Sequence, residues 1–85
     1  MKKVIKFYKQ SCNPCDQVDA HLQKMGVGYE SINAYDQPDV AAKYRIRSVP
    51  TVLVLNENGV EIARSVGYKP EILNDILQYG TKEDY

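Results

Sequence analysis

The stretch VIKFYKQSCNPC, residues 4–15, joins a short apolar run directly to a pair of closely spaced cysteines. Residues 4–8 are mostly β-branched or aromatic, which predicts a strand. Over residues 14–25 the apolar side chains recur at steps of three and four, which is typical of an amphipathic helix. Pro14 fits the first turn of such a helix, where a missing N–H costs no hydrogen bond. The stretch therefore predicts a strand that leads to Cys12 at the N-terminus of a helix.

The middle of the chain predicts a strand, a short helix and a hairpin. Residues 29–32 alternate enough for a second strand, and Pro38 opens a short helix. Residues 49–55 form a nearly continuous apolar run, which predicts a buried strand. Asn58-Gly59 is a strong hairpin signal, so the following residues up to Val66 are expected to return antiparallel to that strand.

A final helix and the order of elements define the fold class. The helix is predicted to have Pro70 in its first turn and to end at Gly80. The order βαβαββα predicts an α/β fold with a four-stranded mixed sheet flanked by three helices, in which the first two strands pair in parallel through a right-handed crossover. A chain of 85 residues holds one core, so we expect a single domain over residues 1–85, with residues 81–85 as a polar tail.

The composition limits the classes of partner. The 11 basic and 11 acidic side chains give zero net charge, which argues against a dedicated nucleic-acid or membrane-surface binder. No apolar run approaches the roughly 20 residues of a membrane span, and the N-terminal stretch lacks the pattern of a secretory leader. We therefore expect a cytoplasmic monomer whose partners are proteins or small molecules, with neither nucleic acid nor membrane among them.

Cys12 and Cys15 are the only cysteines of the chain, and a bridge between them closes too small a loop to stabilise the fold much. Such a close pair indicates either a reversible redox couple or half of a metal site. A structural zinc site needs four ligands, whereas the chain offers one cysteine pair and one histidine, so only a dimer completes it. The redox couple is the favoured interpretation, and we predict no metal site in the single chain.

The two cysteines are expected to play different roles in disulfide exchange. The thiolate is the attacking species, and an ordinary cysteine is only a few per cent ionised at pH 7. The unpaired N–H groups and the positive dipole end of the helix favour a thiolate at Cys12, and Lys9 adds a nearby positive charge. Cys12 is therefore the predicted nucleophile. Cys15, one turn further on the apolar face, is predicted to be more buried and to resolve the mixed disulfide.

Four motifs follow one another along the chain. They are Ser-Cys-Asn-Pro-Cys at residues 11–15, Ser-Val-Pro-Thr at residues 48–51, the Asn-Gly hairpin, and Val66-Gly67 before the last helix. Over nearly the whole chain this combination resembles the thioredoxin superfamily, which implies a minimal thioredoxin fold. The resemblance implies a cis Pro50, although only about 5 to 6% of X-Pro bonds are cis. It also implies that the backbone of Val49 pairs with an extended substrate and that Gly67 lets the other side of the groove approach closely.

Two positions near the cysteines depart from thioredoxins. Ser11 stands where they carry a tryptophan, and Lys6 stands where they carry a buried aspartate. A carboxylate general base is therefore not expected at position 6. The proton of Cys15 is expected to pass to water or to another group.

The length is that of glutaredoxins, but residues 66–70 disfavour glutathione binding. Val-Gly-Tyr-Lys-Pro stands there in place of the glycine pair and aspartate with which glutaredoxins hold glutathione. The segment from Gly67 is instead similar to that of the small redoxins of NrdH type, which serve ribonucleotide reductase. Small thioredoxin-like proteins of bacteriophages and bacteria share this size and layout. Tyr68 either contacts the substrate or packs as a half-exposed aromatic where the last helix begins.

The resemblance implies a thiol–disulfide oxidoreductase that reduces protein disulfides and binds no cofactor itself. Its electrons are expected to come from NADPH through a thioredoxin-reductase-type flavoenzyme. A glutathione-coupled glutaredoxin, a metal-bridged dimer and a non-catalytic binding module remain as alternatives. Arg45 and Arg47 form either a basic rim for an acidic partner or ordinary solvated charge. The substrate-binding residues that the resemblance predicts are Val49, Pro50, Gly67 and Tyr68.

Overall fold

The helices and strands follow one another in the order that the sequence predicts. The structure is a computed structural model that describes residues 2–81. Its elements are β1 (Lys3–Tyr8), α1 (Asn13–Met25), β2 (Glu30–Asn33), α2 (Pro38–Lys43), β3 (Thr51–Leu55), β4 (Glu61–Val66) and α3 (Pro70–Thr81).

The strands form one four-stranded sheet in the order β2-β1-β3-β4. β1 pairs in parallel with β2, with Phe7 opposite Ile32, and antiparallel with β3, with Phe7 opposite Thr51. β4 pairs antiparallel with β3, with Val66 also opposite Thr51. The predicted mixed sheet is confirmed, and all five residues of the central strand β3 are buried.

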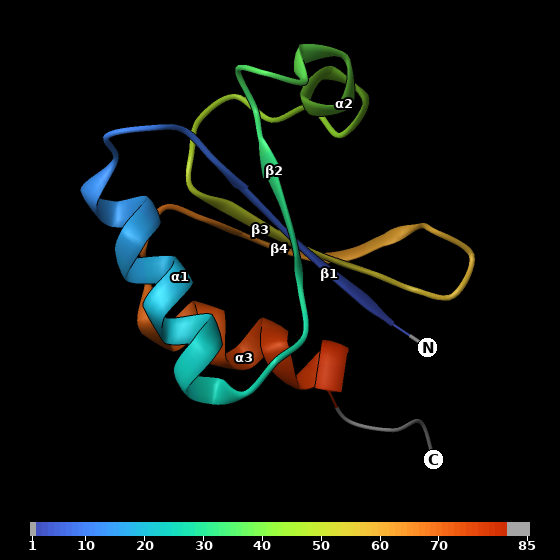
Figure 1. The fold of residues 1–85 in the computed structure, drawn as a ribbon. Helices are drawn as coiled ribbons and strands as arrows, with labels where there is room; N and C mark the ends of the chain where they lie inside the picture. Colours follow the sequence, from blue (N-terminus) through green and yellow to red (C-terminus); the bar gives the residue numbers. More distant parts are fainter. Residues whose placement is uncertain (1, 82–85) are drawn as a thin grey trace.

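Helices cover both faces of the sheet. Figure 1 shows α1 and α3 together on one side of the sheet and α2 on the other. Each face has its own apolar cluster, because side chains of a strand alternate between the two faces. The cluster under α1 and α3 includes Val4, Val18, Leu22, Val52, Leu73 and Leu77. The cluster under α2 includes Ile5, Phe7, Ile32, Ala41 and Leu53.

The C-terminus of α1 differs from the predicted apolar face in one residue. Met25 was expected on that face, but 47% of it is exposed. The helix ends because Gly26 adopts a left-handed conformation with φ of 71°. The N–H of Val27 then donates to the carbonyl of Leu22 at 3.3 Å, and Val27 enters the core instead of Met25.

Several element boundaries also differ from the prediction by one or two residues, and β2, expected over residues 29–32, spans Glu30–Asn33. The strand expected over residues 49–55 begins at Thr51, because Pro50 has no N–H to donate to a neighbouring strand. α3 runs to Thr81, one residue beyond the predicted end at Gly80. Residues 82–85 of the predicted tail lie outside the described residues. Among residues 2–81, no helix is long and apolar enough to cross a membrane.

Candidate active site

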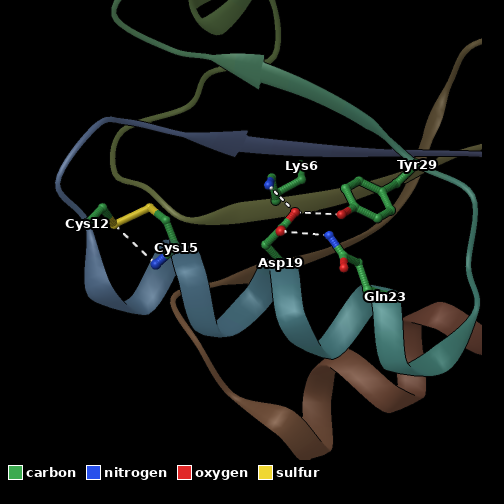
Figure 2. Close-up of polar contacts among 6 residues, drawn as sticks. All are labelled: Lys6, Cys12, Cys15, Asp19, Gln23 and Tyr29. Carbon is green, nitrogen blue, oxygen red and sulfur yellow. Dashed lines mark hydrogen bonds and ion pairs between the residues drawn. A yellow bond between two sulfur atoms is a disulfide. The ribbon is translucent and has the colours of Figure 1, made fainter.

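Cys12 and Cys15 lie at the start of α1, as predicted, and are joined by a disulfide (Figure 2). Their Cα atoms are 5.2 Å apart. Cys12 is the N-cap residue of the helix, and Cys15 lies in its first turn. Both are largely buried, with 6% of Cys12 and 3% of Cys15 exposed, which is the expected order. Which of the two attacks first stays a prediction.

The N-terminus of α1 supplies a hydrogen-bond donor to the sulfur of Cys12. The backbone N–H of Cys15 donates to that sulfur at 3.2 Å, so a cysteine side chain takes the capping position that serine or aspartate often fills. A helix N-terminus favours negative charge because its first N–H groups have no partner within the helix. In the reduced protein this helix N-terminus is expected to favour a thiolate at Cys12, which stays a prediction.

The segment before β3 lies at the same end of the sheet as the cysteines. The Val49–Pro50 peptide bond is cis, which confirms the prediction. The carbonyl of Pro50 accepts a hydrogen bond from the N–H of Gly67 at 2.8 Å, and the hydroxyl of Thr51 donates to the carbonyl of Ser48 at 2.8 Å. Thr51 stands opposite both the end of β1 and the end of β4. The register therefore brings Val49, Pro50 and Gly67 together beside the loop that leads to Cys12.

Gly67 is needed here for its backbone conformation. Its φ is 80°, in the region that side chains with a Cβ rarely adopt. A Cβ built on Gly67 meets nothing within 4 Å, so no neighbour among residues 2–81 approaches closely. The expected close approach thus has no counterpart inside the protein, and a substrate that approaches Gly67 stays a prediction.

Replacing Gly67 with alanine is expected to lower the free energy of unfolding by about 1 kcal/mol, because alanine is strained at positive φ. Gly28→Ala is the matched control, since Gly28 has no positive φ and equal space for a Cβ. Urea denaturation of both variants measures the difference. A cost at Gly67 no larger than that at Gly28 would contradict the conformational explanation.

A buried lysine and a carboxylate meet beside the cysteines, and the sequence analysis missed this contact. Lys6 is 6% exposed, and its Nζ lies 2.7 Å from Oδ1 of Asp19 on α1. The hydroxyl of Tyr29 donates to the same oxygen at 2.5 Å, and Nε2 of Gln23 donates to Oδ2 at 3.0 Å. We call these four residues the Asp19 cluster. Figure 2 shows its carboxylate one helical turn beyond Cys15, between Lys6 and Tyr29.

The Asp19 cluster places a carboxylate next to position 6 of β1. No carboxylate lies at that position in β1, as expected, but α1 supplies one against it. Residues four apart on a helix share a face, so the spacing of Cys15 and Asp19 was the available signal. The lysine ammonium also lies 4.9 Å from the ring centroid of Tyr8 and 5.4 Å from that of Tyr29. The aromatic faces therefore help to hold a charge that is nearly excluded from water.

The Asp19 cluster is expected to make stability depend on acid pH. Hydrogen bonds, first from Lys6 and then from Tyr29, hold the pKa of Asp19 below its ordinary value. The unfolded chain therefore binds this proton at higher pH than the folded one. The contribution of Asp19 is fully present above the ordinary aspartate pKa of about 3.9 and is lost as the pH falls through the folded value.

Urea denaturation between pH 6 and pH 2 measures this effect, with Asp19→Asn as the reference. The difference in unfolding free energy between the two proteins should shrink as the pH falls. A difference that stays constant down to pH 2 would mean that the charge of Asp19 adds no stability.

Comparison with known proteins identifies the family. The family model described as Thioredoxin matches residues 1–79 of this chain. The chain belongs to the thioredoxin family. Thioredoxin-family membership and the Cys12–Cys15 disulfide together make it a thioredoxin-like protein-disulfide oxidoreductase.

Relatives in the thioredoxin family include small and full-length proteins. The chain is 34% identical over 76 residues to the SPbeta prophage-derived thioredoxin-like protein YosR of Bacillus subtilis (strain 168), covering 89% of this chain and 95% of that protein. It is 35% identical over 75 residues to the thioredoxin of Mycoplasma pneumoniae, covering 82% of this chain and 72% of that one. The solved structure of Malassezia sympodialis thioredoxin (Mala s 13) aligns with a TM-score of 0.84 at 25% identity, covering 95% of this chain and 76% of that one.

Tyr68 of this thioredoxin-family chain packs inward. It is half-buried against the cluster under α1 and α3. Its ring lies 6.2 Å from that of His21 on α1, centroid to centroid, and Nε2 of His21 is 2.7 Å from Oδ1 of Asn74 on α3. Tyr68 therefore helps to join α1 to α3, and its predicted contact with substrate stays a prediction.

Arg64 of β4 holds the segment between α2 and Pro50. Its guanidinium donates to the carbonyl of Tyr44 at 2.6 Å and to that of Arg45 at 3.3 Å, and the carboxylate of Glu61 binds it at 2.7 Å. Their mutual hydrogen bond lowers the pKa of Glu61 and raises that of Arg64. Arg45 has a φ of 56°, which is uncommon outside glycine. The sequence analysis did not single out Arg64, because its two carbonyl partners lie 19 and 20 residues away.

No cluster of three or more metal-ligating side chains occurs within residues 2–81.

Proposed function

We propose that this protein reduces disulfide bonds of other proteins in the cytoplasm, and that a thioredoxin-reductase-type flavoenzyme restores its dithiol with electrons from NADPH. The observation that carries the proposal is the position of Cys12. Its sulfur caps α1, accepts the N–H of Cys15, and lies at the end of the sheet that also carries the cis Pro50. Relatives named thioredoxin support the proposed disulfide reduction.

The reaction needs two exchanges at sulfur. The thiolate of Cys12 attacks one sulfur of the substrate disulfide, so that bond breaks, a mixed disulfide forms, and the other substrate sulfur leaves as a thiolate. Cys15 then loses its proton and attacks the sulfur of Cys12, which releases the second substrate sulfur. Two electrons have passed from the cysteine pair to the substrate, and the protein is left with the Cys12–Cys15 disulfide.

The substrate is held by the backbone of the segment before β3. The backbone of Val49, the residue before cis Pro50, pairs with an extended substrate segment. Main-chain pairing of this kind gives affinity with modest sequence specificity. Main-chain pairing by itself therefore does not restrict the substrate to one protein.

Ribonucleotide reductase is the substrate that we propose to test first. The segment Gly67-Tyr68-Lys69-Pro70 is similar to that of NrdH-type redoxins, and the chain lacks the glycine pair and aspartate that bind glutathione in glutaredoxins. Both features favour a protein reductant that is regenerated by a thioredoxin-reductase-type enzyme.

The experiment compares two regenerating systems with one disulfide-containing protein substrate. NADPH consumption is followed with thioredoxin reductase, and separately with glutathione and glutathione reductase. Turnover only with thioredoxin reductase supports the proposal. Turnover only with glutathione would assign a glutaredoxin function, and no turnover in either system would favour a binding module.

A further inference from the structure

A pocket of about 470 Å³ lies beside the segment that would hold the substrate. Its floor is apolar and comes from Ala34, Ala41 and Ile46, which belong to α2 and the loops on either side of it. Val49, the residue before cis Pro50, forms one wall. A volume of this size lies within the range of small ligand sites and accommodates a side chain.

The rim of this pocket is basic. Lys9 and Arg47 both line it, and none of its lining residues is an aspartate or glutamate. Within residues 2–81 neither of these two cations forms an ion pair with a carboxylate. Asp36 lines a separate hollow of about 170 Å³ that shares Lys9 and Tyr35 with the pocket. The pocket itself therefore presents positive charge above an apolar floor.

The pocket also lies where a bound substrate would pass. Phe7 stands opposite Thr51, so Lys9, two residues beyond Phe7, lies at the same end of the sheet as Val49. Side chains of an extended peptide alternate between two sides. A peptide paired with Val49 thus directs side chains near its cystine toward this pocket. Tyr35, which is 74% exposed, adds an aromatic surface at the rim.

We propose that this pocket selects protein disulfides whose cystine is flanked by an apolar residue and an acidic residue. The apolar side chain occupies the floor formed by Ala41 and Ile46, and the carboxylate lies between Lys9 and Arg47. This inference rests on the proposed function, since it names the substrate class of the same site. Opposite charge across such an interface sets partner choice more than total affinity.

The test uses three disulfide peptides that differ only beside the cystine, where each carries leucine next to Glu, Gln or Lys. Protein reduced beforehand and freed of reductant is mixed with each peptide, and the released peptide thiol is measured in a single turnover. This design needs no regenerating enzyme. At low ionic strength the Glu peptide should react about tenfold faster than the Gln peptide, and the Lys peptide slowest.

Arg47→Glu is the decisive variant, and Arg45→Glu is its matched control. Arg45 lies two residues away and carries the same charge, but it does not line this pocket; it lines a neighbouring hollow, which Arg47 also lines. Arg47→Glu should reverse the preference between the Glu and Lys peptides, while Arg47→Lys and Arg45→Glu should retain it. The change should appear in the peptide concentration that gives the half-maximal rate, because Arg47 acts on binding.

The outcomes separate this inference from the proposed function. Equal rates for all three peptides, or equal effects of Arg45→Glu and Arg47→Glu, would overturn the pocket while the reductase function stands. If Arg47→Glu changed the rate with glutathione disulfide but with none of the peptides, the pocket would be assigned to glutathione. That result would also overturn the proposed selection of protein disulfides. If the protein, with both of its thiols free, reduced none of the peptides, both the pocket inference and the proposed reductase function would be overturned.

Discussion

Replacing Cys12 with serine is expected to lower the second-order rate constant of disulfide reduction by at least about 1,000-fold. A serine hydroxyl is not ionised near pH 7 and does not attack disulfide sulfur. The fold should persist, because a serine oxygen at the N-cap also accepts the N–H that now bonds to the sulfur of Cys12. Turnover with a disulfide protein and far-ultraviolet circular dichroism measure the two effects. Reduction that survives in Cys12→Ser would refute the assignment of the nucleophile.

Cys15→Ser is the matched variant for the second exchange. With Cys12 intact and no resolving thiol, the first exchange should proceed and stop at the mixed disulfide. One substrate molecule should remain bound to Cys12 in a non-reducing gel and be released by dithiothreitol. If no such adduct forms, the two cysteines do not divide the reaction as proposed.

Asp19→Asn is expected to lower the free energy of unfolding by about 2 kcal/mol and the melting temperature by about 10 °C. The change leaves the ammonium of Lys6 without a counter-charge, and only 7% of the lysine side chain is exposed. The cost should stay below the roughly 3 to 5 kcal/mol of a fully buried pair, because 35% of the Asp19 side chain is exposed. Thermal and urea denaturation at pH 7 measure it.

The two partners of this ion pair should not be equivalent. Lys6→Met removes the buried charge and leaves Asp19 with Tyr29, Gln23 and water, so it should cost less than Asp19→Asn. Asp75→Asn removes an exposed carboxylate of α3 and should change the free energy of unfolding by less than about 0.5 kcal/mol. A larger cost for Lys6→Met than for Asp19→Asn would show that packing of the lysine chain, and not its charge, matters most.

Local sequence patterns were sufficient to predict the fold and the helix that carries the cysteines. The steps of three and four after Pro14 identified α1, and the Asn-Gly turn identified the β3–β4 hairpin. Both signals involve residues close together in sequence, where spacing alone fixes which side chains share a face. The cis Pro50 was different, since it came from resemblance to a family and not from local preference.

Contacts between distant residues could not be predicted in this way. Lys6 interrupts an apolar strand, which alone suggests a solvated side chain. Its burial depends on Asp19, which lies 13 residues further along the chain and reaches it only once α1 packs on the sheet. The hydrogen bond from Arg64 to the carbonyl of Tyr44 likewise depends on the register of β4. Such partners follow from tertiary packing.

The site forms only when strands from distant parts of the chain have paired. Cys12 and Cys15 follow β1, whereas Val49 and Pro50 precede β3 and Gly67 follows β4. A nascent chain that has reached only residue 50 already carries both thiols, but it has no β3 or β4 to hold Pro50 and Gly67 against each other. Until β3 and β4 have formed, no strand pairing holds Val49 and Gly67 at the end of the sheet that carries the cysteines, and a proteolytic cut in the turn at residues 56–59 would separate Cys12, Cys15 and Pro50 from Gly67.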